Sequence, residues 1–200
     1  GRGDVWRELR ADDGADYDEH DEIDLSSVEP LIACPSSPGN VVKVRDVAGL
    51  KVDQVIIGSS VNSSFRDLMV VAKMMEGRHR HWDTAFHINP GSRQVLENIA
   101  DHEGLMALLM VGARIHESGC LGCIGMGQAP GTGQVSLRTF PRNFPGRSGT
   151  KDDKVYLCSP ETAAAAALKG VITDPRDLGK EMDYPRIKHP AQYVIDESSI

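Results

Sequence analysis

The 200-residue chain lacks a long apolar run, because the longest one, residues 105–113, is only nine residues and contains Gly112. Crossing a bilayer takes roughly 20 apolar residues, so we expect no membrane span. The first ten residues carry charges and no apolar segment follows them, so we also expect no secretory signal peptide. Aromatic residues make up 5% of the chain, which leaves few stacking surfaces for single-stranded nucleic acids.

Cysteine is also scarce, with four residues at positions 34, 120, 123 and 158. This number is too small for a disulfide scaffold and indicates a reducing compartment, the cytoplasm or, in a eukaryote, the mitochondrial matrix. Two nucleotide-binding motifs are missing as well. The chain has no G-x-x-x-x-G-K-[ST] sequence, and Pro130 stands where the pair Gly125-x-Gly127 would need the third glycine of a dinucleotide fingerprint.

Acidic residues are concentrated near the N-terminus. Residues 1–30 hold 11 acidic and 3 basic side chains, a net charge of −8, whereas the whole chain carries −7 and the other 170 residues therefore carry +1. A nearly neutral body lacks the basic stripe of a nucleic-acid-binding protein. Pro30, Pro35 and Pro38 interrupt regular structure. We therefore expect residues 1–50 to form an acidic, irregular arm that packs on or leads into the domain, with a short strand around residues 23–25.

The rest of the chain alternates between strand and helix patterns. The apolar run at residues 54–58 predicts a buried strand, and Ser64 with Asp67 predicts the capped start of a helix that ends at Gly77. Further strands are expected at residues 84–88, 113–116, 135–140 and 155–158, and further helices at 92–102, 104–112 and 160–170. This order predicts an α/β domain over residues 51–175, with a mainly parallel sheet, helices on both faces and a site at the carboxyl ends of the strands. Residues 176–200 are expected to be a tail or linker.

Cys120 and Cys123 lie three residues apart in a glycine-rich loop. Their spacing is compatible with a zinc site completed by His116 and by Cys158 or Cys34. A dithiol redox pair has the same spacing, but such a pair normally starts a helix, and Gly125 with Gly127 disfavours a helix here. An iron–sulfur site that takes a third cysteine from elsewhere is also compatible. Two small apolar side chains buried in a turn would give the same pattern.

Arg142 and Arg147 flank a Pro-Gly turn. Two guanidinium groups at this spacing could bind one multiply charged anion, and bidentate pairing with carboxylates is their usual chemistry. The alternative is a pair of solvated surface arginines.

Together these features resemble the third domain of the aconitase superfamily, the iron–sulfur hydro-lyases that include aconitate hydratase and isopropylmalate isomerase. Residues 58–63 (G-S-S-V-N-S) are similar to the family's G-S-C-T-N-S, and residues 142–147 (R-N-F-P-G-R) to the end of its N-R-N-F-x-G-R. Three shorter matches lie in family order: P-G-S at residues 90–92, G-C-x-x-C at 119–123, and S-P-E before an alanine run at 159–161. The segment at residues 17–30 resembles the lead into the third domain of aconitases, and it favours a citrate/isocitrate type over an isopropylmalate type.

The resemblance implies a 4Fe-4S cluster that is held by three cysteines and that binds substrate through its open iron. It assigns Cys120 and Cys123 as ligands, Arg142 and Arg147 as carboxylate-binding residues, and Asn62 to a place beside the cluster. Ser60, however, stands where the family has its first cluster cysteine, and Pro141 replaces the asparagine before Arg142. A serine hydroxyl is a far less available ligand than a thiolate at neutral pH, which puts the cluster in doubt.

The resemblance therefore implies the cluster- and carboxylate-binding domain of a hydro-lyase that isomerises a hydroxy tri- or dicarboxylic acid by dehydration and rehydration, as in the tricarboxylic acid cycle. The chain by itself is expected to be inactive, because the family's acid–base residues lie on other domains, on another chain or outside these residues. The alternative is a degenerate aconitase-like domain that has no cluster and acts as a structural or binding module.

Overall fold

A computed structural model describes residue 5, residues 7–180 and 186–196, and residue 198. Its centre is a seven-stranded sheet with the order β2-β1-β7-β6-β3-β4-β5. The five parallel strands are β3 (Gln54–Ile57), β4 (Ala85–Ile88), β5 (Arg114–Ile115), β6 (Val135–Arg138) and β7 (Lys154–Leu157). The hairpin of β1 (Leu31–Ala33) and β2 (Val41–Lys43) adds to one edge in antiparallel fashion. The predicted α/β class with a mainly parallel sheet is confirmed.

The described residues contain four α helices. Helix α1 (Phe65–Met75) lies between β3 and β4, helices α2 (Arg93–Asp101) and α3 (Gly104–Met110) lie between β4 and β5, and α4 (Pro160–Lys169) follows β7. The predicted capping box is present at the start of α1, where Ser64 and Asp67 satisfy each other's backbone N–H groups. Ser92 and Ser159 accept hydrogen bonds from the first turns of α2 and α4 in the same way. Each cap follows the carboxyl end of a strand, so the caps direct the chain away from the sheet edge where the site was expected.

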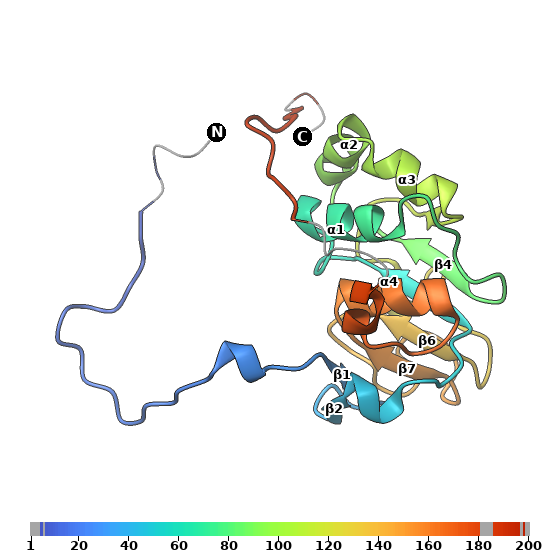
Figure 1. Cartoon of the computed structure of the whole chain (residues 1–200), viewed down its shortest axis with the longest axis horizontal. Coiled ribbons are helices and arrows are strands. Elements are labelled where there is room, and N and C mark those ends of the chain that lie inside the picture. The colour runs from blue at the N-terminus through green and yellow to red at the C-terminus, as the bar shows by residue number, and fades with distance from the viewer. Residues whose placement is uncertain (1–4, 6, 181–185, 197, 199–200) are drawn as a thin grey trace.

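One face of the sheet is apolar and carries all four α helices. Val55 and Ile57 of β3 point into this core together with Leu137 of β6, since alternate residues of a strand share a face. Figure 1 shows α1 and α4 lying across the strands on this side. The core also contains the five consecutive alanines of α4, residues 163–167, all of which are fully buried. Small side chains there let α4 pack closely on β3 and α1.

The opposite face is covered by loop instead of α helix, which differs from the expectation of helices on both faces. A smaller apolar cluster on this face includes Ile56 and Cys123. The chain after β5 crosses here and contains the short 3₁₀ helix η4 (Gly122–Ile124). The reason is the chemistry of the strands, because Gln54, Ser136 and Arg138 are buried and polar on this side. Gln54 and Arg138 donate to loop carbonyls, and the Ser136 hydroxyl donates to Gln54.

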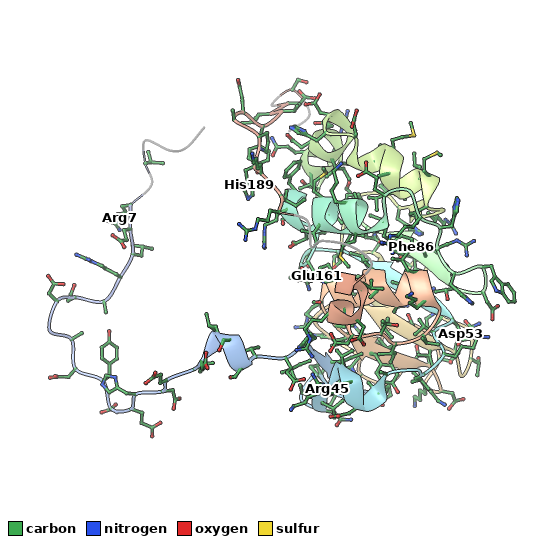
Figure 2. All side chains as sticks on the ribbon, in the orientation of Figure 1. Arg7, Arg45, Asp53, Phe86, Glu161 and His189 are labelled. Carbon is green, nitrogen blue, oxygen red and sulfur yellow. The ribbon has the colours of Figure 1, made fainter. Side chains whose placement is uncertain are left out.

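The N-terminal arm is exposed along residues 7–28 and extends away from the body in Figure 1, with Arg7 far from the sheet in Figure 2. The strand expected at residues 23–25 is wrong. Asp24 instead caps the 3₁₀ helix η2 (Leu25–Ser27) by accepting a hydrogen bond from the Ser26 N–H at 2.9 Å. The part of the arm expected to be irregular also contains the strands β1 and β2. Pro30, Pro35 and Pro38 lie outside both strands, so they do not interrupt them.

The end of the arm is tied to the domain by charge. Glu29 forms ion pairs with Lys43 at 3.1 Å, with Arg45 in the 3₁₀ helix η3 (Val44–Val47), and with Arg176 in the 3₁₀ helix η5 (Pro175–Lys180) at 3.2 Å. These partners hold the pKa of the Glu29 carboxyl below its usual value. Asp174 also pairs with Arg176, at 2.6 Å.

Part of the expected tail packs against the domain. Asn98 of α2 exchanges two hydrogen bonds with the backbone of Val194, at 2.9 and 2.8 Å. The ring of Phe65 in α1 contacts His189 and Tyr193, with ring centroids 6.3 and 5.5 Å apart, and Figure 2 shows His189 on this segment beside α1. Within the residues that the structure describes, no helix is long and apolar enough to cross a membrane.

Candidate functional site

Four side chains from three loops meet at the carboxyl ends of the parallel strands. Ser60, directly after β3, places its hydroxyl 3.6 Å from the Cys120 sulfur, although 60 residues separate the two. Cys123, three residues on in the same loop, contributes to the lowered pKa of the Cys120 thiol. The Nη2 of Arg147 donates to the Cys123 sulfur at 3.4 Å. The structure therefore brings Ser60, Cys120, Cys123 and Arg147 together.

The two thiols have different surroundings. Cys120 and Ser60 are exposed, whereas only 1% of the surface of Cys123 is exposed. The hydrogen bond from the Ser60 hydroxyl lowers the pKa of the Cys120 thiol, because it stabilises the thiolate. Both sulfurs thus have a hydrogen-bond donor beside them, a hydroxyl for Cys120 and a guanidinium for Cys123.

Arg142 and Asn62 are not joined to this group. Arg142 is exposed, and no ion pair or hydrogen bond of its side chain occurs within the described part of the chain. Asn62 has the left-handed backbone angle φ 52° and donates its amide N–H to the Thr139 carbonyl at 2.6 Å. The side chain of Asn62 therefore connects the loop after β3 to the loop after β6.

The guanidinium of Arg147 has donor capacity left over. Its Nε is buried, and no residue in the described ranges provides an acceptor for it. A buried donor without a partner costs about 1–3 kcal/mol, and a bound anion is one way to satisfy it. The position beside Cys123 makes Arg147 the group in this site that is best placed to bind an anionic oxygen.

The sequence reasoning missed a buried arginine beneath the cysteine loop. Arg138 is fully buried, and its guanidinium donates to the carbonyls of Gly122 at 2.9 Å and Gln128 at 2.8 Å. Two further hydrogen bonds go to Ser136 at 2.9 Å and to Gln54 at 3.1 Å. Burial lowers the pKa of Arg138 to about 10, so this side chain stays charged at neutral pH. The alternation of apolar and polar residues along residues 135–138 was the signal that could have identified it.

Glycine is required where the cysteine loop touches the loop that carries Arg147. Gly125 has φ 78°, and a Cβ at this position would overlap the carbonyl oxygen of Ser148. The Ser148 hydroxyl in turn donates to the Cys123 carbonyl at 3.3 Å. The close approach of these two segments fixes Cys123 next to Arg147.

A histidine pair, also unforeseen, lies on the same face. His87 of β4 and His116 after β5 are joined by a ring-nitrogen hydrogen bond of 2.8 Å. Burial, followed by the nearby charge of His116, lowers the pKa of His87 to about 4, and burial also lowers that of His116. His116 is therefore hydrogen-bonded to His87. Phe86, the residue before His87 on β4, is labelled in Figure 2 and marks the position of this strand.

The donor set does not fit a cluster held by three thiolates. Position 60 offers a hydroxyl, and the remaining ligands are the two thiols of Cys120 and Cys123. Among the residues that the structure describes, no three His, Cys, Asp or Glu side chains come together to hold a metal ion. The zinc alternative with His116 and Cys158 or Cys34 fails on the same observation.

The fold and these loops match a known family. Residues 45–170 match the aconitase family (aconitate hydratase), which is more than half of the chain and includes all four site residues. This chain belongs to the aconitase family. The resemblance drawn from the short motifs is thereby confirmed.

Individual relatives cover most of this chain but less than half of their own length. The 3-isopropylmalate dehydratase large subunit of Elusimicrobium minutum is 40% identical over 182 residues, 90% of this chain and 43% of the relative. A 3-isopropylmalate dehydratase large subunit of Methanopyrus kandleri is 42% identical over 176 residues, covering 87% and 42%. The homoaconitase large subunit of Thermus thermophilus is 41% identical over 176 residues, covering 86% and 42%. The chain thus spans about two fifths of the length of these relatives.

Proposed function

We propose that this chain is the carboxylate-binding domain of an aconitase-family hydro-lyase that acts on a hydroxy di- or tricarboxylic acid. Arg147 supports the proposal most directly, since its buried Nε has no acceptor among the described residues and its Nη2 donates to the Cys123 sulfur. An incoming carboxylate would supply the missing acceptor in a charge-assisted hydrogen bond. Arg142, exposed and without an ion pair in the described ranges, would bind a second carboxylate of the same acid.

The names of the relatives favour an isopropylmalate-type or homocitrate-type substrate over the citrate/isocitrate type expected from residues 17–30. The chain alone would bind the acid without dehydrating it. In this proposal the remaining domains, on the same polypeptide or a second one, provide the acid–base residues, in line with the relatives being large subunits that extend beyond the matched region. We place the protein in a reducing compartment, and we keep residues 51–175 as the domain proper.

The second candidate is a family member that binds carboxylates or partner domains without a cluster. Ser60 favours it, because the third ligand position next to Cys120 is a hydroxyl. Anaerobic iron and sulfide analysis after cluster reconstitution separates the two candidates. A colourless protein that retains carboxylate binding supports the second, and a brown protein with about four irons per chain supports a cluster-containing hydro-lyase.

Carboxylate binding is tested by titrating the full chain with 3-isopropylmalate and with citrate in a calorimeter. Replacing Arg147 by Met should weaken binding by at least about tenfold, since a charge-assisted hydrogen bond contributes about 1.5–3 kcal/mol. Arg66→Met is the matched control, because Arg66 is exposed on α1 outside the site. Equal binding by the wild type and Arg147→Met would refute the assignment of Arg147.

A further inference from the structure

Residues 186–196, which we call the strap, lie against α1 and α2 without forming a helix or strand of their own (Figure 1). Most of their side chains are exposed, so a few specific contacts hold the strap in place. The buried side-chain amide of Asn98 in α2 donates to the Val194 carbonyl at 2.9 Å and accepts from the Val194 N–H at 2.8 Å. Since one side chain binds both backbone groups of one residue, α2 holds the strap by its main chain.

Phe65, the first residue of α1, is the second anchor of the strap. Its buried ring contacts the rings of His189 and Tyr193, with centroids 6.3 and 5.5 Å apart. The ring of His102, at the C-terminal end of α2, packs on Phe65 as well, at 5.3 Å. The strap therefore joins the start of α1 to α2 through one aromatic ring and one amide.

The strap leaves space on both sides. A cavity of about 350 Å³ is lined by Phe65, Val95 and Tyr193 together with their neighbours. A second cavity, of about 550 Å³, is lined by Met69 of α1 and by Ile187 of the strap. A segment with few contacts, exposed side chains and space beside it opens at a lower free energy than a packed core. We therefore expect the strap to detach and return while the sheet stays folded.

Both helices under the strap begin at loops of the candidate site. The N-cap of α1 is Ser64, which ends the loop that carries Ser60. The N-cap of α2 is Ser92, which ends the loop after β4. Because the anchor Phe65 directly follows the first of these caps, the strap acts on the helix end nearest the site.

The loops after β3 and β4 also contact each other and the cysteine loop. A Cβ on Gly91 would lie 2.6 Å from the Ser63 Oγ, so the two loops pack with no room for a side chain between them. The Gly119 N–H donates to the Pro90 carbonyl at 3.2 Å and so joins the cysteine loop to the loop after β4. A continuous set of contacts thus runs from the strap to the candidate site.

We propose that the strap docks reversibly on α1 and α2 and that, while docked, it restrains the loops after β3 and β4 at the candidate site. In the docked state Asn98 and Phe65 fix the two helices relative to each other, and their capped starts fix the loops. In the detached state the helices stay on the sheet, because their apolar faces remain in the core, but the loops gain freedom. A variant that weakens the contacts of the strap shifts the population toward the detached state.

Hydrogen–deuterium exchange of the full chain, resolved to single amides, tests this proposal. The Val194 N–H reports on docking, because its acceptor is the side chain of Asn98. The N–H groups of Asp67 and Val95 report on the starts of the helices, because they donate to the two N-cap side chains. In Asn98→Leu, exchange of the Val194 N–H should accelerate at least about tenfold. Exchange at the two helix starts and at residues 58–63 should accelerate at least about threefold.

Two further variants separate the strap from general stability. Tyr193→Ala removes an exposed side chain of the strap and its ring contact, leaves α2 unchanged, and should give the same pattern of faster exchange. Gln94→Ala is the matched control. Its side chain is exposed on α2 beside the first cavity, and only its backbone carbonyl is bonded to Asn98. This variant should exchange as the wild type does, and the amides of β6 and β7 should keep their rates in all three variants.

The proposal is supported if the amides of the strap and the loops accelerate together while those of β6 and β7 do not. It is overturned if the Val194 N–H exchanges as fast in the wild type as in Asn98→Leu, or if the strap detaches and the loop amides keep their rates. It is also overturned if, in both Asn98→Leu and Tyr193→Ala, the loops accelerate only together with β6 and β7. These measurements use no carboxylate and no metal, so either result leaves the proposed function unaffected.

Discussion

Arg138 supports the cysteine loop from beneath, and its replacement by Met is the most demanding test of this architecture. The guanidinium is fully buried and makes four hydrogen bonds, two of them to the carbonyls of Gly122 and Gln128 in the loop. Methionine has a similar length but cannot donate, so both carbonyls would stay buried without this partner. We expect the loop to detach and the sheet to lose part of its cover.

The size of the effect follows from these contacts. Both carbonyls keep a second donor, the Gln54 amide for Gln128 and the Gly125 N–H for Gly122. The variant therefore loses hydrogen bonds to a charged donor, about 1.5–3 kcal/mol each, and part of this is offset because it no longer buries a charge. The free energy of unfolding should therefore fall by about 3–5 kcal/mol, a large share of the roughly 5–15 kcal/mol of a typical domain. Urea denaturation, followed by circular dichroism, measures this difference. A second readout is the reaction of Cys123 with a thiol reagent in the native state, which should accelerate at least about tenfold as its shielding is lost.

Two further variants make the Arg138 test decisive. Arg66→Met removes an exposed arginine and should change the unfolding free energy by less than about 0.5 kcal/mol. Arg138→Lys keeps the charge but cannot reach all four acceptors, so its loss should lie between those of the wild type and Arg138→Met. The reasoning is refuted if Arg138→Met unfolds within about 1 kcal/mol of the wild type and Cys123 remains protected.

Two more predictions concern the same face of the sheet. Gly125→Ala should lower the free energy of unfolding, measured by urea denaturation, by at least about 1 kcal/mol. The reason is that residue 125 has φ 78° and that the new Cβ would overlap the Ser148 carbonyl. A variant as stable as the wild type would contradict this close approach. The pKa of His87 is lowered from 6.5 to about 4, so between these pH values the unfolded chain binds more protons than the folded chain. The contribution of His87 to the free energy of unfolding should therefore be lost as pH falls from 6.5 to 4, and it should be constant above pH 6.5. The loss amounts to at most about 3.4 kcal/mol, at 1.36 kcal/mol per pKa unit. The variant His87→Gln should flatten the profile; an unchanged acid profile in this variant would show that another group is responsible.

Much of the fold could be predicted because local signals agreed with the tertiary structure. The buried run of β3 was followed by a capping box at Ser64, and Ser159-Pro160 marked the start of α4 as expected. The short strands β1 and β2 were missed because they are three residues each, too short for a periodic pattern. They are strands because they pair with each other and with β7, which only the assembled sheet provides.

The candidate site was predicted in part. The family motifs named Ser60, Cys120, Cys123 and Arg147, and the structure brings these four together. The support beneath them could not be assigned, because the partners of Arg138 come from three separate segments and two of them are backbone carbonyls, which carry no sequence signature. The side chain of Asn62 donates to the Thr139 carbonyl, and its expected place beside a cluster stays a prediction. The roles of Arg142, Arg147 and Asn62 toward a substrate stay predictions.

The central claim is that Ser60 occupies the third ligand position of a site whose other two positions are Cys120 and Cys123. Iron and acid-labile sulfide per chain, measured after anaerobic reconstitution of the wild type and of Ser60→Cys, test it most directly. We predict that Ser60→Cys retains more iron and sulfide per chain than the wild type, because a third thiolate then stands beside Cys120. Equal iron content in the two proteins would contradict the placement of Ser60 in this site.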